Sequence, residues 1–205
     1  MLLTDEEHRQ RQIHLDWTSE MAKLYIGGHM IYWYVAYTMA GHEKKVEDYL
    51  NRYFWDKPYK TIILLLEIIH RKPQRVSKDV KPMFPGYLIV ESEVPSHEFF
   101  LDFKMAMNSS THKIRLLSYG NTDEIAMREE ERTAFLKLCN KEYCVEASIG
   151  IIVGTKIFIK EGPLIGYESI IKKIDRHKRY AIIELEMMGG TREVRLPLEI
   201  IEKVK

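Results

Sequence analysis

The chain has 205 residues, 45% of them hydrophobic, which is enough for one large domain or two small ones with a buried core. A formal net charge of +1 excludes binding of nucleic acid through overall charge, so any basic surface has to be local. The two cysteines, Cys139 and Cys144, indicate reduced thiols of a cytoplasmic protein rather than a disulfide or a metal site. The apolar run 61–69 contains Glu67 and is too short to cross a bilayer, so we expect no membrane contact.

Residues 1–29 are polar and charged and lack the apolar core of a signal peptide. Gly27-Gly28-His29-Met30 is typical of a cloning junction, and Met30 stands directly before the first predicted strand. We interpret 1–29 as either an extension or an added segment, and we expect the first domain to begin at residue 30.

Between residues 31 and 119 the hydrophobic pattern alternates between strand and helix periods. It predicts strands at 31–37, 61–70, 83–91 and 114–119, helices at 43–55 and 96–107, and a basic loop at 71–75. The order β-α-β-β-α-β is typical of a ferredoxin-like split-βαβ sheet with helices on one face. A further helix is predicted at 128–138, and we expect this α+β domain to span residues 30–139.

The helical period ends after residue 138, and none returns from residue 154 onward. Instead the sequence predicts four short strands with glycine-containing turns at 162–163 and 189–190, the strands lying at 156–159, 170–174, 180–185 and 193–196. About fifty residues of short strands indicate a small SH3-like β-barrel. We therefore expect a linker at 140–150 and a barrel domain at 151–205.

Four motifs occur in a specific order: Trp33-Tyr34-Val35, Gly41-His42-Glu43, Phe84-Pro85-Gly86-Tyr87 and Gly162-Pro163-Leu164. In this order and spacing they resemble the NusG family of bacterial transcription elongation factors, which join an N-terminal NGN domain to a C-terminal KOW domain. The resemblance covers residues 31 to about 204. Within the family, the segments 81–87 and 162–179 look most like the LoaP branch, whose members are antitermination factors of long biosynthetic operons.

The resemblance implies that the first domain docks on the clamp helices of RNA polymerase through an apolar patch. The matching positions lie on the first and third strands: Tyr37, Phe84, Tyr87 and Ile89. Rings held on a rigid sheet give binding energy at little entropic cost, although the same rings also suit a core. Tyr87 and Ile89 share one face of their strand, and Leu88 takes the other.

Two further contacts follow from the resemblance. His97, at the start of the second helix, matches a polar run that contacts polymerase in the RfaH branch; an ordinary exposed helix-start residue is the alternative. Ile165 and Tyr167 match the loop through which general NusG proteins contact the termination factor Rho or a ribosomal protein.

The predicted barrel carries seven Lys and four Arg against eight acidic residues. Six of the eight positions from 172 to 179 are basic or His, and Arg192 and Arg195 join them if the strands form a meander. LoaP-like proteins are expected to bind an RNA hairpin of the leader transcript, and RNA hairpins are held through phosphates and loop bases. The candidate RNA-binding residues are Lys172, Lys173, Arg176, His177, Lys178, Arg179, Arg192 and Arg195. A solvated basic turn is the alternative.

The sequence contains no glycine-rich phosphate loop, no Cys-His metal spacing and no nucleophile elbow, so we expect neither an enzyme nor a cofactor or metal. The predicted function is a specialised, monomeric antitermination factor that binds RNA polymerase and a leader RNA hairpin. Two alternatives stay open: a general NusG factor, and a ribosome-associated KOW-domain protein.

Overall fold

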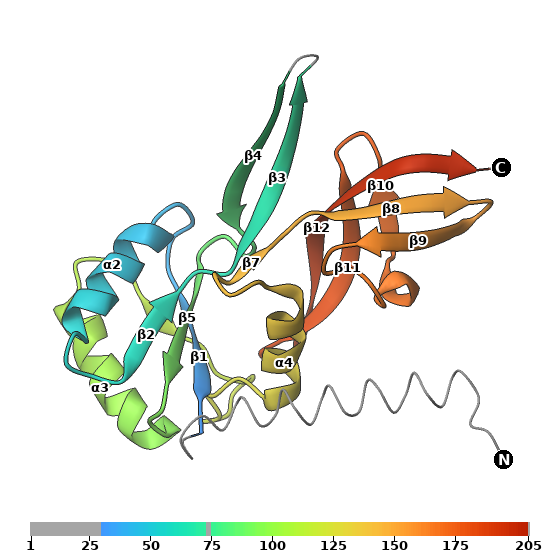
Figure 1. The fold of residues 1–205 in the computed structure, drawn as a ribbon. Coiled ribbons are helices and arrows are strands. Elements are labelled where there is room, and N and C mark those ends of the chain that lie inside the picture. The colour runs from blue at the N-terminus through green and yellow to red at the C-terminus, as the bar shows by residue number, and fades with distance from the viewer. Residues whose placement is uncertain (1–29, 73–74, 205) are drawn as a thin grey trace, which may run out of the picture.

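The computed structural model describes residues 30–204 except 73 and 74 (Figure 1). Its first half is a four-stranded sheet in the order β2-β5-β1-β6, with all pairs antiparallel. The elements of this half are β1 (Tyr32–Tyr37), α2 (Glu43–Tyr53), β2 (Tyr59–Ile62), β5 (Tyr87–Ser92), α3 (Ser96–Ser109) and β6 (Arg115–Leu116). This arrangement is the predicted split-βαβ sheet, and the predicted α+β fold class is confirmed.

The two faces of the sheet are covered by different elements, because successive side chains of a strand point to opposite sides. Tyr34 and Leu88, on one face, pack with Leu50 of α2 and Phe99 of α3 in one buried cluster. The other face carries Trp33, Val35 and Ile89, which belong to a second cluster. This second cluster also contains residues of α4 (Glu129–Leu138) and of the C-terminal sheet.

A long β-hairpin projects from the first half (Figure 1). Its strands are β3 (Leu65–Lys72) and β4 (Arg75–Pro82), and β7 (Cys144–Val145) pairs in parallel with the base of β3. Polar contacts join its two strands: Lys78 Nζ forms an ion pair with a Glu67 oxygen at 3.0 Å, and His70 Nε2 lies 3.2 Å from an Asp79 oxygen. At the base of the hairpin, Leu66 is buried in the cluster that contains α4, and Ile68 packs against that cluster.

This hairpin corrects the predicted strands of the middle region. The single strand expected at 61–70 is two strands, because the chain leaves the first sheet after Ile62 and pairs with β4 and β7 instead. The strand expected from residue 83 begins at Tyr87, since 83–86 form a turn. β4 was not predicted, because its alternation is mostly polar and its Val80 is 61% exposed. The expected basic loop at 71–75 falls on the hairpin tip, where residues 73 and 74 lie outside the described residues.

The C-terminal half is a five-stranded sheet in the order β10-β11-β12-β8-β9. Its strands are β8 (Ser148–Val153), β9 (Lys156–Glu161), β10 (Lys173–Asp175), β11 (Tyr180–Met187) and β12 (Gly190–Val204), with a 3-10 turn, η2, at Glu168–Ile170. β10, β11 and β12 form an antiparallel meander, whereas β12 pairs in parallel with β8. β7 and the start of β8 fall within the segment expected as a linker, because both are recruited as sheet strands.

Helix α4 lies between the two halves, and its Glu131 bonds to the C-terminal sheet. The Glu131 carboxylate accepts hydrogen bonds from the backbone N–H groups of Met188 (3.1 Å) and Gly189 (3.2 Å), in the turn between β11 and β12. The hydroxyl of Tyr119, which follows β6, donates a third at 2.6 Å. Phe135 of α4 is fully buried in the cluster that also contains Leu185 and Met187. The two halves therefore share one core and one buried hydrogen-bonded carboxylate.

Candidate functional site

The turn at Phe84–Tyr87 is held against the end of β1 by backbone bonds. Thr38 N–H donates to the Gly86 carbonyl at 2.7 Å, and Gly86 N–H donates to a carboxylate oxygen of Glu43 at 2.5 Å. Gly86 has a φ of +87°, and a Cβ there would lie 2.7 Å from the Thr38 carbonyl oxygen. Only glycine suits such a left-handed, closely packed position. The sequence thus fixes the ring-bearing residues on either side of Gly86.

Burial of Glu43 acts to raise its pKa, but hydrogen bonds from the backbone N–H groups of Glu43 itself, Gly41 and Gly86 outweigh burial and lower the pKa. Its carboxylate stays charged at neutral pH, because three donors stabilise the ionised form. The helix start of α2 and the turn before β5 are therefore joined through one carboxylate.

Three rings form a continuous row beside this turn, which we call the aromatic row: Tyr37, Tyr87 and Phe84. The ring centroids of Tyr37 and Tyr87 are 5.1 Å apart, and those of Tyr87 and Phe84 are 6.3 Å apart, both edge-on at 69°. Phe84 then meets the buried ring of Phe135 in α4 at 5.7 Å and 90°. All three rings of the row are half-buried, so each offers part of its surface to solvent. The guanidinium of Arg115 lies over Tyr37, 5.5 Å from its centroid, a neighbour that the sequence analysis did not include.

Ile89 differs from its expected role. It shares the face of Tyr87, as strand alternation predicted, but only 3% of it is exposed because it is buried in the cluster that contains α4. The expectation that Ile89 presents a free surface is therefore wrong for this structure. Leu88 and Val90 cover α2 and α3, as alternation requires.

His97 does not join the aromatic row. It is exposed in the first turn of α3, which follows the Ser92 end of β5, whereas Tyr87 begins the strand. Five residues of extended chain span about 17 Å. His97 instead lines a cavity of about 480 Å³ with Phe100 and residues of the 116–125 segment.

Five of the eight predicted RNA-binding residues are exposed at one end of the C-terminal sheet. We call them the basic cluster: Lys173, Arg176, His177, Lys178 and Arg195. Lys173, Ile182 and Arg195 stand in one row across β10, β11 and β12 and share the outer face. The turn between β10 and β11 is held by Asp175, which accepts a hydrogen bond from the Lys178 backbone N–H at 2.8 Å. That bond lowers the pKa of Asp175.

The other three predicted residues have different surroundings. Lys172 pairs with Glu184 at 3.1 Å, and Arg179 lies 3.8 Å from a Glu199 oxygen. Arg192 pairs in register with buried Leu185, far along β11 from the basic turn and on the opposite face from Arg195. The meander expected from the sequence is present, but it brings only Arg195 to the basic cluster.

The loop after β9 is anchored at two points and exposed at its tip. Gly162 has a φ of +95°, with room for no Cβ because Ser148 Cα would lie 2.6 Å away. The fully buried Leu164 donates its N–H to Ser148 Oγ at 3.1 Å. Ile165 is 56% exposed at the tip, whereas Tyr167 is half-buried against the shared core. Of the two predicted contact residues of this loop, Ile165 is the more exposed.

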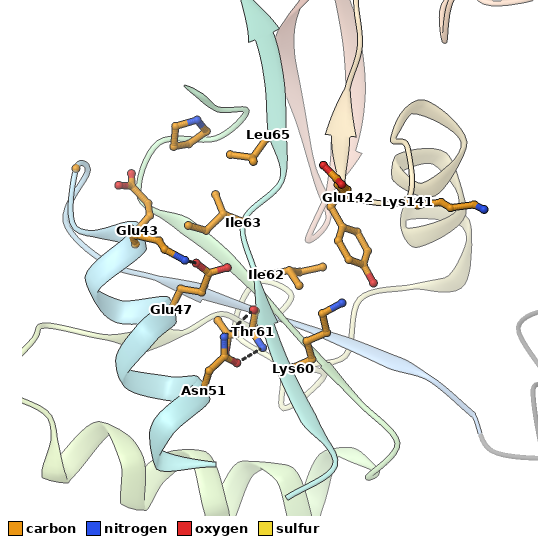
Figure 2. Close-up of a pocket in the computed structure, with 14 residues that line it drawn as sticks. Glu43, Glu47, Asn51, Lys60, Thr61, Ile62, Ile63, Leu65, Lys141 and Glu142 are labelled. Carbon is orange, nitrogen blue, oxygen red and sulfur yellow. Dashed lines mark hydrogen bonds and ion pairs between the residues drawn. The ribbon is translucent and has the colours of Figure 1, made fainter. Parts of the chain in front are cut away.

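A groove of about 840 Å³ runs between α2, β2 and residues 141–143 (Figure 2). Two lysines that line the groove have partners within it. Lys44 forms an ion pair with Glu47 at 2.6 Å, and Lys60 Nζ lies 4.9 Å from the ring centroid of Tyr143. Asn51 makes two hydrogen bonds to the backbone of Thr61. The contacts of Asn51 join α2 to β2.

Among the described residues, no group of three or more His, Cys, Asp or Glu side chains is arranged to hold a metal ion. Helices in the same part of the chain are too short or too polar to cross a membrane. Burial raises the pKa of the Cys139 thiol to about 12, and Cys144 is also free, with a raised pKa for the same reason.

Comparison with known proteins agrees with this architecture. The family model described as transcription termination factor NusG matches residues 31–136. The transcription termination/antitermination protein NusG of Halalkalibacterium halodurans is 25% identical over 84% of this chain and 98% of that protein. The corresponding protein of Lactococcus lactis is 25% identical over 84% of this chain and 93% of its own length.

One solved structure, reported for domain interaction in Thermotoga maritima NusG, is 20% identical, covers 83% of this chain and 94% of that chain, and has a TM-score of 0.45. The family model spans more than half of the chain, including the aromatic row and both strands that carry it. The chain therefore belongs to the NusG family, whose members are transcription termination and antitermination factors.

Proposed function

We propose that this protein is a specialised antitermination factor that docks on RNA polymerase through the aromatic row and binds a leader RNA hairpin through the basic cluster. The observation that carries the proposal is the coexistence of two unlike surfaces on one shared core. One is a half-exposed row of three rings, and the other is a set of five basic or His residues.

The aromatic row has the properties of a protein-docking surface. Its rings are held by a glycine that admits no side chain and by a buried carboxylate, so little freedom remains to be lost on binding. Aromatic side chains on such rigid supports often dominate the energy of interfaces. Docking on the polymerase clamp helices is the role that the NusG resemblance implies for these positions, with Ile89 as support beneath the rings.

The basic cluster has the properties of a phosphate-binding surface. Its members are exposed, and Asp175, the acidic residue of the turn, is held by the turn's own backbone. Lys and Arg on a protruding turn suit the closely spaced phosphates of an RNA stem. Ile165, at the tip of the loop after β9, is a further candidate for contact with a protein partner.

In vitro transcription across a terminator tests the proposal, with paired templates that either carry or lack a hairpin in the leader. We expect read-through that depends on the hairpin and that is lost in the double variant Lys173→Glu, Arg176→Glu. A variant at Tyr87 should lose the hairpin-dependent read-through while still binding the hairpin RNA, because it removes only the docking on polymerase. Equal read-through on both templates would reject the specialised role and favour a general NusG factor. Recovery of ribosomal subunits without polymerase in a pull-down would favour the ribosome-associated alternative.

A further inference from the structure

The outer face of the β10–β12 meander changes from basic to acidic along the strands. The row formed by Lys173, Ile182 and Arg195 lies next to the turn. The next outward-facing row toward the other end pairs Glu184 with Glu193 across β11 and β12, and both are exposed. Phosphates are attracted to the first row and repelled from the second. A bound RNA backbone is therefore restricted to the turn end of this face.

An aromatic ring lies at this basic end. Tyr180 is the first residue of β11 and stands across from Asp175 on β10 and Pro197 on β12. It is half-buried, and the guanidinium of Arg195 lies over its ring, 5.5 Å from the centroid. Within the basic cluster, Arg195 is the residue whose guanidinium lies over an aromatic ring.

From this arrangement we infer that Tyr180 and Arg195 form a stacking site for one unpaired base of the RNA, and that this pair supplies the preference for a loop over a plain duplex. The inference rests on the proposed RNA-binding function. It assigns Tyr180 and Arg195 a role in base recognition, in addition to the attraction of phosphates by charge. Bases of single-stranded loops stack on aromatic rings and on Arg guanidinium planes, whereas bases inside a duplex are already stacked. Lys173 and residues 176–178 then hold the phosphates on either side.

The neighbouring contacts keep this pair available. Lys172, which adjoins Lys173, is paired with Glu184 rather than directed to the Tyr180 end. Arg179, which adjoins Tyr180, lies near Glu199. Leu198 N–H donates to the Arg179 carbonyl at 3.0 Å, so the turn meets β12 at the level of the ring. Tyr180 is thus positioned by backbone pairing on both sides.

Binding of a stem-loop library tests the inference. The probes are RNA hairpins with one common stem and a randomised six-base loop, and the reference is the same stem as a blunt duplex. Wild-type protein should prefer a subset of loops over the duplex. Tyr180→Leu should lose about 10-fold in affinity for those loops, the typical effect of removing a base-stacking ring, and bind the duplex unchanged. Tyr180→Phe should bind the loops as wild type does, which separates stacking from loss of the fold.

Arg195→Lys provides the matched test of the guanidinium. It keeps the charge but removes the plane, so we expect loss of loop preference with duplex binding retained. Replacing one preferred loop base with 5-iodouridine should give a photo-crosslink to Tyr180 in wild type. Equal loop binding by wild type, Tyr180→Leu and Arg195→Lys would overturn the stacking site while leaving hairpin binding intact. If wild-type protein binds none of the probes, the proposed RNA-binding function itself fails.

Discussion

The aromatic row and the basic cluster are built in opposite ways. The row depends on buried constraints, namely Gly86 at a positive φ, the Glu43 carboxylate and packing on Phe135. The cluster depends on an exposed turn between paired strands, in which the Asp175 carboxylate accepts a hydrogen bond from the Lys178 backbone N–H. An apolar interface needs fitted surfaces, whereas charges act over several ångströms. The difference predicts that the two surfaces respond to different perturbations.

The largest expected effect is on the support of the aromatic row. Gly86→Ala should lower the free energy of unfolding by about 3 kcal/mol or more, because strain at positive φ adds to a clash with the Thr38 carbonyl. Gly41→Ala is the matched control, with nearly the same φ (+86°) but no atom within 4 Å of the added Cβ. It should cost about 1 kcal/mol. Urea unfolding measures both, and equal losses would contradict a role for close packing at Gly86.

The next largest effect is a difference in salt dependence between RNA binding by the basic cluster and polymerase binding by the aromatic row. Three cations of the basic cluster lie on phosphates, namely Lys173, Arg176 and Lys178, and they predict that raising monovalent salt from about 50 to 200 mM weakens RNA binding about 20- to 40-fold. Polymerase binding through the aromatic row should change much less, because apolar contacts are not screened. Fluorescence anisotropy with labelled RNA and with labelled polymerase gives both slopes. Equal dependence of the RNA and polymerase affinities on salt would contradict an apolar aromatic row beside a charged basic cluster.

Removal of one ring tests the docking energy directly. Tyr87→Ala should weaken binding to RNA polymerase about 30-fold, the loss typical of a central aromatic interface residue. Phe158→Ala is the control, since Phe158 is 45% exposed and lies on β9 of the C-terminal sheet. Surface plasmon resonance with immobilised polymerase distinguishes the two variants. A similar loss of polymerase affinity in both variants would mean that the polymerase interface does not lie on the aromatic row.

Acid should weaken the support of the row. The pKa of Glu43 is lower in the folded protein than its ordinary value of 4.5, so the carboxylate contributes stability above that pH and loses it as the pH falls through the folded pKa. Glu43→Gln should therefore cost about 1–2 kcal/mol at pH 7, and the difference from wild type should shrink below pH 4. Urea unfolding from pH 3 to pH 7 follows this trend. A difference that stays constant with pH would exclude the charged hydrogen bonds as its source.

The smallest expected effects concern basic residues outside the cluster. Arg192→Ala and Lys172→Ala should each change RNA affinity less than about two-fold, because Arg192 is distant and Lys172 already pairs with Glu184. Lys173→Ala is the comparison inside the cluster and should weaken binding about five-fold. A filter-binding titration at fixed salt measures all three. A large loss with Arg192→Ala would extend the RNA site to the far end of the sheet.

Local sequence patterns predicted much of this molecule. Alternation correctly separated Leu88 from Ile89, and the helix periods located α2, α3 and α4. Alternation could not predict that a third element would cover the second face of the sheet. The burial of Ile89 by α4 therefore had no sign in the sequence near residue 89. β4 was missed for a related reason, because a strand joined to its partner by polar side-chain contacts has little apolar period. The expected position of Arg192 beside the basic turn was wrong, because strand register, rather than distance in sequence, decides which arginines meet.

The bond between Glu131 and the β11–β12 turn restricts the two halves of the protein unequally. On the turn side the donors are backbone N–H groups, so the side chain at residue 188 can change without removing a donor. Residue 189 has no such freedom, because a Cβ there would meet the Tyr119 ring at 3.0 Å. On the helix side the acceptor is a single carboxylate. The turn can therefore change its side chain at residue 188 but not at residue 189, whereas both hydrogen bonds from the turn to α4 depend on one side chain, that of Glu131.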